Sequence, residues 1–424
     1  MRTTFDHSRS AARSPTPAGW LADDARNVRH LYVWSFGLRF GAGMLGWLLT
    51  VMAGMPFLED AFLYEKMGAQ IAQDWMAGHA SEVLAQAIGT RGVPWLMAAT
   101  IGGIYWLTGG LRIVPLLLAG YCALTAITPV LTYRIARHLG MPPRAALFSG
   151  RLVGFSPAFA FWSGALYKEG LVLLMLNLCF YCLLHLQQRP TWHTTAGAFG
   201  ALAGIFGLRF YLAALMTGVA LVGLALGRGS RHSFPAALRQ IFLVAAFSLL
   251  VVGSGLREKM AATLPSDLDE VLQTLDSSRQ DLGAAASGFS AGISIVTPGQ
   301  AAAYLPLGLG YFLFSPMPWQ VGQFRQNMVI PETLAWVCFY PLMVWGVRRG
   351  LRANFQGILL LAIAAGAISC FYALFAGNIG TVYRMRIQLW LILAIFAGWG
   401  RQALWEKRAA QQLRRELPEG FRIR

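Results

Sequence analysis

The sequence predicts an all-α protein, a polytopic transmembrane helical bundle, and three observations carry that prediction. The chain of 424 residues is 56% hydrophobic and only 13% charged, whereas soluble domains carry about 25% charged residues. Apolar runs near the length of a bilayer crossing recur along the whole chain. The five cysteines all lie in such runs, where a thiol packs as a small hydrophobe. These features exclude a soluble enzyme and a secreted disulfide scaffold.

Twelve apolar segments are candidate membrane elements, and several are so short that they require tilt or partial insertion. The first 30 residues are polar and rich in arginine, without the apolar stretch of a cleavable signal peptide. In chain order the segments are Val33–Met55, Val93–Thr108, Ile113–Tyr133, Ala145–Trp162, Leu171–Leu186, Thr194–Leu208, Tyr211–Leu226, Ile241–Gly255, Ala301–Pro318, Leu334–Val347, Ile358–Phe375 and Ile387–Trp399.

Basic residues predict the orientation, because cytoplasmic loops carry an excess of Lys and Arg. Both tails are basic, and so are the loops Arg134–Arg144, Arg228–Arg239 and Arg348–Arg352. These two tails and three loops lie on the same side of the membrane only if Val93–Tyr133 makes one net crossing. The segment Ala301–Pro331 must also return to the membrane face that it left. We therefore expect about ten crossings (10–12), both termini cytoplasmic, and interfacial helices in the first outer loop. Twelve full crossings is the competing count, and it would put two basic loops outside.

Apart from Glu169 and Glu332, the acidic residues lie in the two tails and in two predicted outer loops. Between Val83 and Arg257 the one acid is Glu169, and between Leu282 and Trp405 it is Glu332. The predicted organisation is a basic cytoplasmic tail (1–30), a transmembrane domain (31–403) with outer loops 56–92 and 257–300, and a second basic tail (404–424).

Ionisable residues mark a candidate site at the outer face. Glu59 and Asp60 directly follow the first crossing, and Tyr64 shares a helical face with Asp60 if a helix begins here. Acids are also preferred at helix starts, so a simple helix cap is the competing interpretation. Lys168 and Glu169 come between two short apolar segments, where an ionisable residue is a functional candidate. The alternative there is an interfacial ion pair that marks a helix end.

Three arginines are expected at the same face. Arg209 lies between two apolar runs, and Arg384 and Arg386 precede the last crossing, against the positive-inside trend. Arginine pairs well with phosphate, so a lipid phosphate or diphosphate is the natural partner, with interfacial anchoring as the alternative. The histidines and cysteines lack the spacing of a metal site. We predict no metal ligands, and a divalent cation as cofactor is left open.

Two further segments are expected near this face. The small-residue run Gly283–Gly288 is typical of a mobile loop that closes over a substrate. The run Phe314–Trp319 carries two prolines and suits a re-entrant or kinked interfacial element.

One chemistry uses all of these groups. A lipid-phosphate sugar donor lies in the bilayer with its phosphate at the interface, where arginines hold the phosphate and stabilise it as a leaving group. A carboxylate then takes the proton from the incoming hydroxyl. No nucleotide site is needed, and no nucleic-acid partner is expected.

The run Glu59–Tyr64 (EDAFLY) resembles the acidic motif of GT-C-type membrane glycosyltransferases, such as protein mannosyltransferases and lipid A aminoarabinose transferases. The resemblance implies that Asp60 is the catalytic base, with Glu59 beside it. It implies that Glu169, in Trp162–Glu169 (WSGALYKE), is the second acid, and it adds Tyr64 and Tyr167 to the site.

The resemblance also implies inverting transfer from a polyprenyl-phosphate-linked sugar to a lipid or glycan acceptor. The run Asn378–Arg386 (NIGTVYRMR) is similar to uncharacterised proteins of bacterial polysaccharide synthesis, which implies the bacterial inner membrane. The motif departs from the family pattern in having Glu59 where the family has Asp. No large outer domain follows the last predicted crossing, so we expect the membrane core and loops to hold the acceptor.

Two other functions fit the same residues. A polysaccharide repeat-unit polymerase also needs outer arginines, but for a lipid-diphosphate oligosaccharide. A lipid-linked-sugar transporter, or a non-catalytic assembly subunit, is the alternative from another class. A transporter is expected to carry charges deep in several helices, whereas here the charges other than Arg112 and Arg151 cluster at segment ends.

Overall fold

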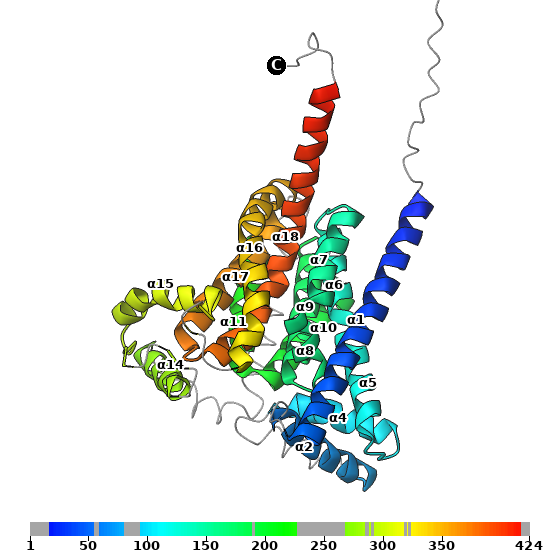
Figure 1. The fold of residues 1–424 in the computed structure, drawn as a ribbon, viewed down its shortest axis with the longest axis vertical. Coiled ribbons are helices and arrows are strands. Elements are labelled where there is room, and N and C mark those ends of the chain that lie inside the picture. Colours follow the sequence, from blue (N-terminus) through cyan, green and yellow to red (C-terminus); the bar gives the residue numbers. More distant parts are fainter. Residues whose placement is uncertain are drawn as a thin grey trace, which may run out of the picture.

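The computed structural model describes residues 17–54, 59–79, 94–188, 191–226, 268–284, 288–289, 292–317, 320 and 324–416. Within these ranges the chain is helical with short turns, and it forms no strand beyond one isolated bridge. Six helical segments in them are long and apolar enough to cross a membrane. The prediction of an all-α bundle that contains helices of membrane-crossing length is therefore confirmed (Figure 1).

The predicted apolar segments that lie in the described ranges all correspond to helices. In chain order the helices are α1 Pro17–Ala53, α2 Glu59–Met76, α4 Trp95–Leu107, α5 Val114–Thr125, α6 Ile127–His138, α7 Pro143–Phe155, α8 Pro157–Gly164, α9 Lys168–Gln188, α10 Trp192–Leu208, α11 Phe210–Leu226, α14 Leu268–Gly283, α15 Pro298–Phe314, α16 Phe324–Ala353, α17 Phe355–Phe375 and α18 Ile379–Glu416. The predicted segment Ile241–Gly255 and the basic loop Arg228–Arg239 lie outside the described residues.

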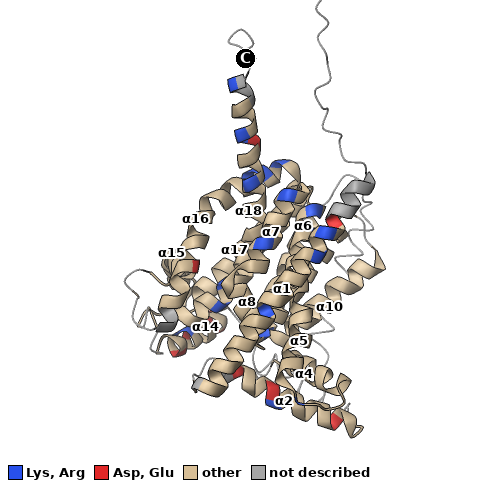
Figure 2. Cartoon of the chain, turned by 45° about the vertical axis from the view of Figure 1, so that its right-hand side comes forward, with Lys and Arg blue, Asp and Glu red and all other residues tan. Residues whose placement is uncertain are grey.

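One end of the bundle is basic. The start of α1 meets the end of α6 through an ion pair of 3.3 Å between Arg137 and Asp24. The ends of α16 and α18 meet through Arg349 and Glu406, 3.2 Å apart. Both described termini lie at this end (Figure 1), and Lys and Arg gather there (Figure 2). We call it the basic end, and we call the opposite end, with α2, α4 and the α8–α9 turn, the far end.

Between residues 94 and 138 one helix is long and apolar enough to cross a membrane, and the single crossing expected for this segment stays a prediction. α5 and α6 run on as one apolar helix from Val114 to His138. α4 is shorter and packs on α2 at the far end. Gly68 and Gly102 leave no room for a Cβ between these two helices, so Ile71 is buried there. Ile71 therefore packs against α4.

Two predicted boundaries do not coincide with structural breaks. The boundary at residues 30/31 falls inside α1, and the boundary at 403/404 falls inside α18. Both helices continue past the apolar segment because their basic ends are still good helix formers. The tails are therefore partly extensions of the membrane helices rather than separate regions.

The second predicted outer loop, 257–300, contains the helix α14, and its described residues 292–297 are not helical. α14 lies beside α17 at the far end. The Asn378 side chain donates to the Leu282 carbonyl at 3.1 Å, and the Phe289 amide donates to the Gly377 carbonyl at 2.9 Å. These bonds hold both sides of the predicted mobile run Gly283–Gly288 against the α17–α18 turn. Residues 285–287 lie outside the described chain.

Candidate functional site

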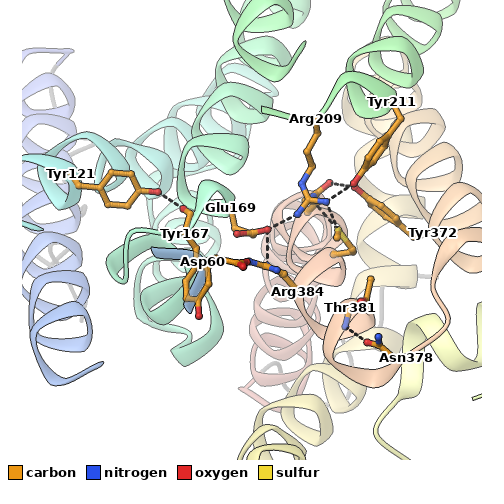
Figure 3. Close-up of polar contacts among 12 residues, drawn as sticks. Asp60, Tyr121, Tyr167, Glu169, Arg209, Tyr211, Tyr372, Asn378, Thr381 and Arg384 are labelled. Atoms are coloured by element: carbon orange, nitrogen blue, oxygen red, sulfur yellow. Dashed lines mark hydrogen bonds and ion pairs between the residues drawn. The ribbon is translucent and has the colours of Figure 1, made fainter. Parts of the chain in front are cut away.

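Four charged side chains from four separate segments meet at the far end (Figure 3). Glu169 opens α9 and forms ion pairs with Arg209, between α10 and α11, and with Arg384 of α18. The Arg384 Nε lies 2.8 Å from Glu169 Oε1, and its Nη2 donates to Asp60 Oδ2 at 2.6 Å. The structure therefore brings together Asp60, Glu169, Arg209 and Arg384, as the sequence predicts.

The two carboxylates of this cluster have different environments. The Glu169 side chain is fully buried, whereas that of Asp60 is 45% exposed. Glu169 Oε2 has no hydrogen-bond partner among the described residues. An exposed carboxylate can take a proton from an arriving molecule, whereas a buried one mainly compensates and positions its cations. The structure thus gives the two acids different exposure and different partners.

Aromatic rings fix the plane of the Arg384 guanidinium. Its Cζ lies 5.1 Å from the ring centre of Trp162 and 5.0 Å from that of Tyr167. Guanidinium stacks on aromatic faces and is weakly hydrated, so such contacts hold it in one orientation. The Tyr121 hydroxyl donates to the Tyr167 carbonyl (Figure 3). Leu166, just before this residue, has a φ of 58°, a strained conformation of a kind that clusters at functional sites.

A break between α7 and α8 sets the position of the α8–α9 turn. Pro157 has no N–H, so the Val153 carbonyl loses the donor it would have in a continuous helix. The buried side chain of Arg39 on α1 donates to the Val153 and Gly154 carbonyls, each at 3.4 Å. A cation at these carbonyls also complements the helix dipole.

The start of α8 is bound by a carboxylate that sequence reasoning did not assign to a site. Glu332 of α16 accepts from the Ala158 amide at 2.8 Å and from the Ser156 hydroxyl. The Tyr383 hydroxyl donates to the same carboxylate at 2.7 Å. Glu332 therefore links α16 and α18 to α8. This link fixes the position of α8, which precedes Tyr167 and the buried Glu169 in the chain.

Lys168 and Tyr64 complete the predicted cluster. Lys168 is partly buried at the start of α9, and no described residue forms a hydrogen bond or ion pair with it. Tyr64 is buried on α2, four residues after Asp60. Burial, followed by the negative charge of Asp60, raises the pKa of Tyr64 to about 12. Its hydroxyl is therefore protonated at physiological pH and is a hydrogen-bond donor.

Arg386 lies apart from this cluster, contrary to its predicted role on the donor phosphate. Its buried guanidinium donates to the Leu313 carbonyl at 2.9 Å, at the end of α15, and to Thr333 at 3.2 Å. Residues two positions apart in a helix point about 200° apart, so Arg384 and Arg386 face different neighbours. The side chain of Glu59 lies outside the described residues.

The side chains that surround Arg209 are not predicted from the sequence. Its Nη1 donates to the Tyr211 hydroxyl and lies 2.9 Å from the Met385 sulfur (Figure 3). Tyr211 in turn stacks on Phe371 of α17, with ring centres 5.3 Å apart. Arg209 is therefore fixed by three helices and cannot swing freely into solvent.

The cluster carries an excess of positive charge. Three cations, Lys168, Arg209 and Arg384, face two carboxylates, Asp60 and Glu169, which gives a formal charge of +1. No three His, Cys, Asp or Glu side chains within the described ranges gather closely enough to hold a metal ion. Such a site can attract an anion while one exposed carboxylate beside it accepts a proton.

The sequence matches no known protein family, and no curated protein is significantly similar to it.

Proposed function

We propose that this chain is a GT-C-type integral-membrane glycosyltransferase, which moves a sugar from a polyprenyl-phosphate donor to an acceptor at the far end. One observation supports this most strongly. The exposed Asp60 lies within 2.6 Å of Arg384, whose second nitrogen is held by buried Glu169. A proton acceptor and phosphate-binding cations thus adjoin one another at one end of a membrane-length bundle.

The proposed reaction divides the work among these residues. Asp60 accepts the proton of the acceptor hydroxyl as that oxygen attacks the anomeric carbon of the sugar. The bond between this carbon and the phosphate oxygen breaks, and its electron pair stays on the phosphate. Arg384 and Lys168 stabilise the developing charge on the leaving polyprenyl phosphate. Glu169 does not react but holds Arg209 and Arg384 in place.

The proposed topology has ten crossings. Within the described ranges α1, α5–α6, α7–α8, α9, α10, α11, α16, α17 and α18 account for nine, and the apolar run Ile241–Gly255 for the tenth. α2, α4 and α15 are interfacial. Because basic ends favour the cytoplasm, the basic end faces it, and the site faces the outside of a bacterial inner membrane.

Lipid analysis of cells that lack the protein tests this function. A transferase of this kind leaves its donor unused, so a polyprenyl-monophosphate monosaccharide is expected to accumulate. Accumulation of a lipid-diphosphate oligosaccharide would instead support the polymerase, and an unchanged lipid pool would contradict both enzymes. Re-expression of the intact chain is expected to restore the normal pool, whereas Asp60→Asn is not.

A further inference from the structure

A groove between α1 and α7 opens at the basic end, away from the proposed reaction site. Its volume is about 620 Å³. α1 lines it with Arg26, His30 and Trp34, and α7 lines it with Leu147, Arg151 and Phe155. Each set is spaced by four residues and so forms one stripe along its helix. The two stripes face each other across the groove.

The α1 wall of the groove changes from polar to apolar along the helix, and the α7 wall places Arg151 between Leu147 and Phe155. Buried Leu31 contacts the backbone region of Gly150, which puts Arg151 at the level of His30. Arg26 lies one turn closer to the basic end. Trp34 is one turn further into the bundle, and its side chain is 61% exposed. This gradient matches a lipid, whose headgroup is polar and whose chains are apolar.

Arg151 is an exposed cation within a helix that packs along the membrane bundle. Among the described residues no carboxylate or other hydrogen-bond partner contacts it. It lies eight residues, or about 12 Å, along α7 from Pro143. A guanidinium at that depth extends toward the interface and needs an anion there.

We propose that this groove binds one anionic phospholipid of the leaflet at the basic end. Arg26, His30 and Arg151 hold its phosphate, and the acyl chains lie along Trp34 and Phe155. Basic pockets between membrane helices suit such headgroups because the charged donors meet the phosphate at its own depth. The lipid would bridge α1 and α7 beside their direct contacts and so help to fasten α1, which precedes α2 and Asp60 in the chain.

Native mass spectrometry of the purified full chain, titrated with phosphatidylglycerol or with phosphatidylcholine of the same chains, tests this proposal. The first phosphatidylglycerol is expected to bind more tightly than phosphatidylcholine. Arg151→Gln is expected to weaken that binding about tenfold, since charge-assisted contacts to phosphate are lost. Arg352→Gln is the matched control, because this arginine is also exposed at the basic end, and it is expected to bind as the wild type does.

A second variant keeps the test decisive if Arg151→Gln does not purify. Trp34→Ala is expected to weaken the binding of phosphatidylglycerol with full-length acyl chains and to leave the binding of dihexanoyl phosphatidylglycerol unchanged. Equal binding of the two headgroups would overturn the proposal, as would equal losses in Arg151→Gln and Arg352→Gln. It would also fail if polyprenyl phosphate bound the groove and phosphatidylglycerol did not. Asp60→Asn is expected to bind phosphatidylglycerol normally, so the result is independent of the transfer reaction.

Discussion

Removal of the charge on Glu169 is expected to lower the free energy of unfolding strongly. Its side chain is fully buried, and so is nearly all of Arg209, whose side chain is 3% exposed. Glu169→Gln keeps the shape and one hydrogen-bond acceptor but leaves the guanidinium uncompensated. Breaking one side of a buried ion pair costs about 3–5 kcal/mol. We expect the lower half of that range, because Arg384 is 22% exposed and keeps Asp60 as a partner.

Reversible unfolding of the purified chain in mixed detergent–SDS micelles, followed by circular dichroism, measures this loss. Asp74→Asn is the matched control, because Asp74 is a partly exposed acid of the far end whose carboxylate accepts a hydrogen bond from Gln70 at 3.2 Å. Surface substitutions of this kind change the free energy of unfolding by about 0.5 kcal/mol or less. A Glu169→Gln protein as stable as this control would refute the assignment of Glu169 as the anchor of the site.

A double-mutant cycle then separates the ion pair from simple damage. Glu169→Gln leaves the buried Arg209 without a carboxylate, and Arg209→Met leaves Glu169 with Arg384 as its one remaining ion-pair partner in the described site, whereas the double variant removes both charges of the pair. The double variant is expected to be more stable than the sum of the single losses by about 1–3 kcal/mol. Additive losses would show that the two side chains do not depend on each other.

Three further predictions follow from the same site. Arg384→Lys is expected to lower the rate of sugar transfer about tenfold, because one ammonium group cannot bridge Asp60 and Glu169 as a guanidinium does. Full activity of this variant in the transfer assay would contradict the prediction. Tyr64→Phe removes a protonated hydroxyl beside Asp60 and is expected to slow transfer without moving its pH profile, because the pKa of Tyr64 is about 12. A shifted profile would mean that Tyr64 titrates during the reaction. A protease site inserted after Gly283 is expected to be cut only from outside, and cleavage in inverted vesicles would overturn the proposed orientation.

The sequence predicts the helices well because length and apolarity decide them. Every predicted apolar segment in the described ranges lies on a helix, and Asp60 does stand in the first turn of one. The strongest signal is the solitary position of Glu169, the one acid in the stretch from Val83 to Arg257. A buried acid in a membrane bundle must have partners, and the two arginines are those partners.

Other features needed the structure because they depend on direction or on distant contacts. Arg384 and Arg386 look equivalent in sequence, but one helix turns them to different faces. Arg39 and Glu332 are far apart in the chain, yet they satisfy the two sides of the same helix break before Pro157. No local sequence pattern predicts that these two side chains bind the same helix break. A proline within an apolar run does indicate that nearby backbone groups need other hydrogen-bond partners.

The proposed role of Asp60 is to accept the proton of the acceptor hydroxyl during sugar transfer from a polyprenyl-phosphate donor. The direct measurement uses the purified chain in liposomes with a labelled polyprenyl-phosphate sugar and follows the release of polyprenyl phosphate and the labelled glycoside. We predict transfer by the wild type and none above background by Asp60→Asn, with Asp74→Asn active and all three proteins equally inserted. Full activity of Asp60→Asn would contradict the account.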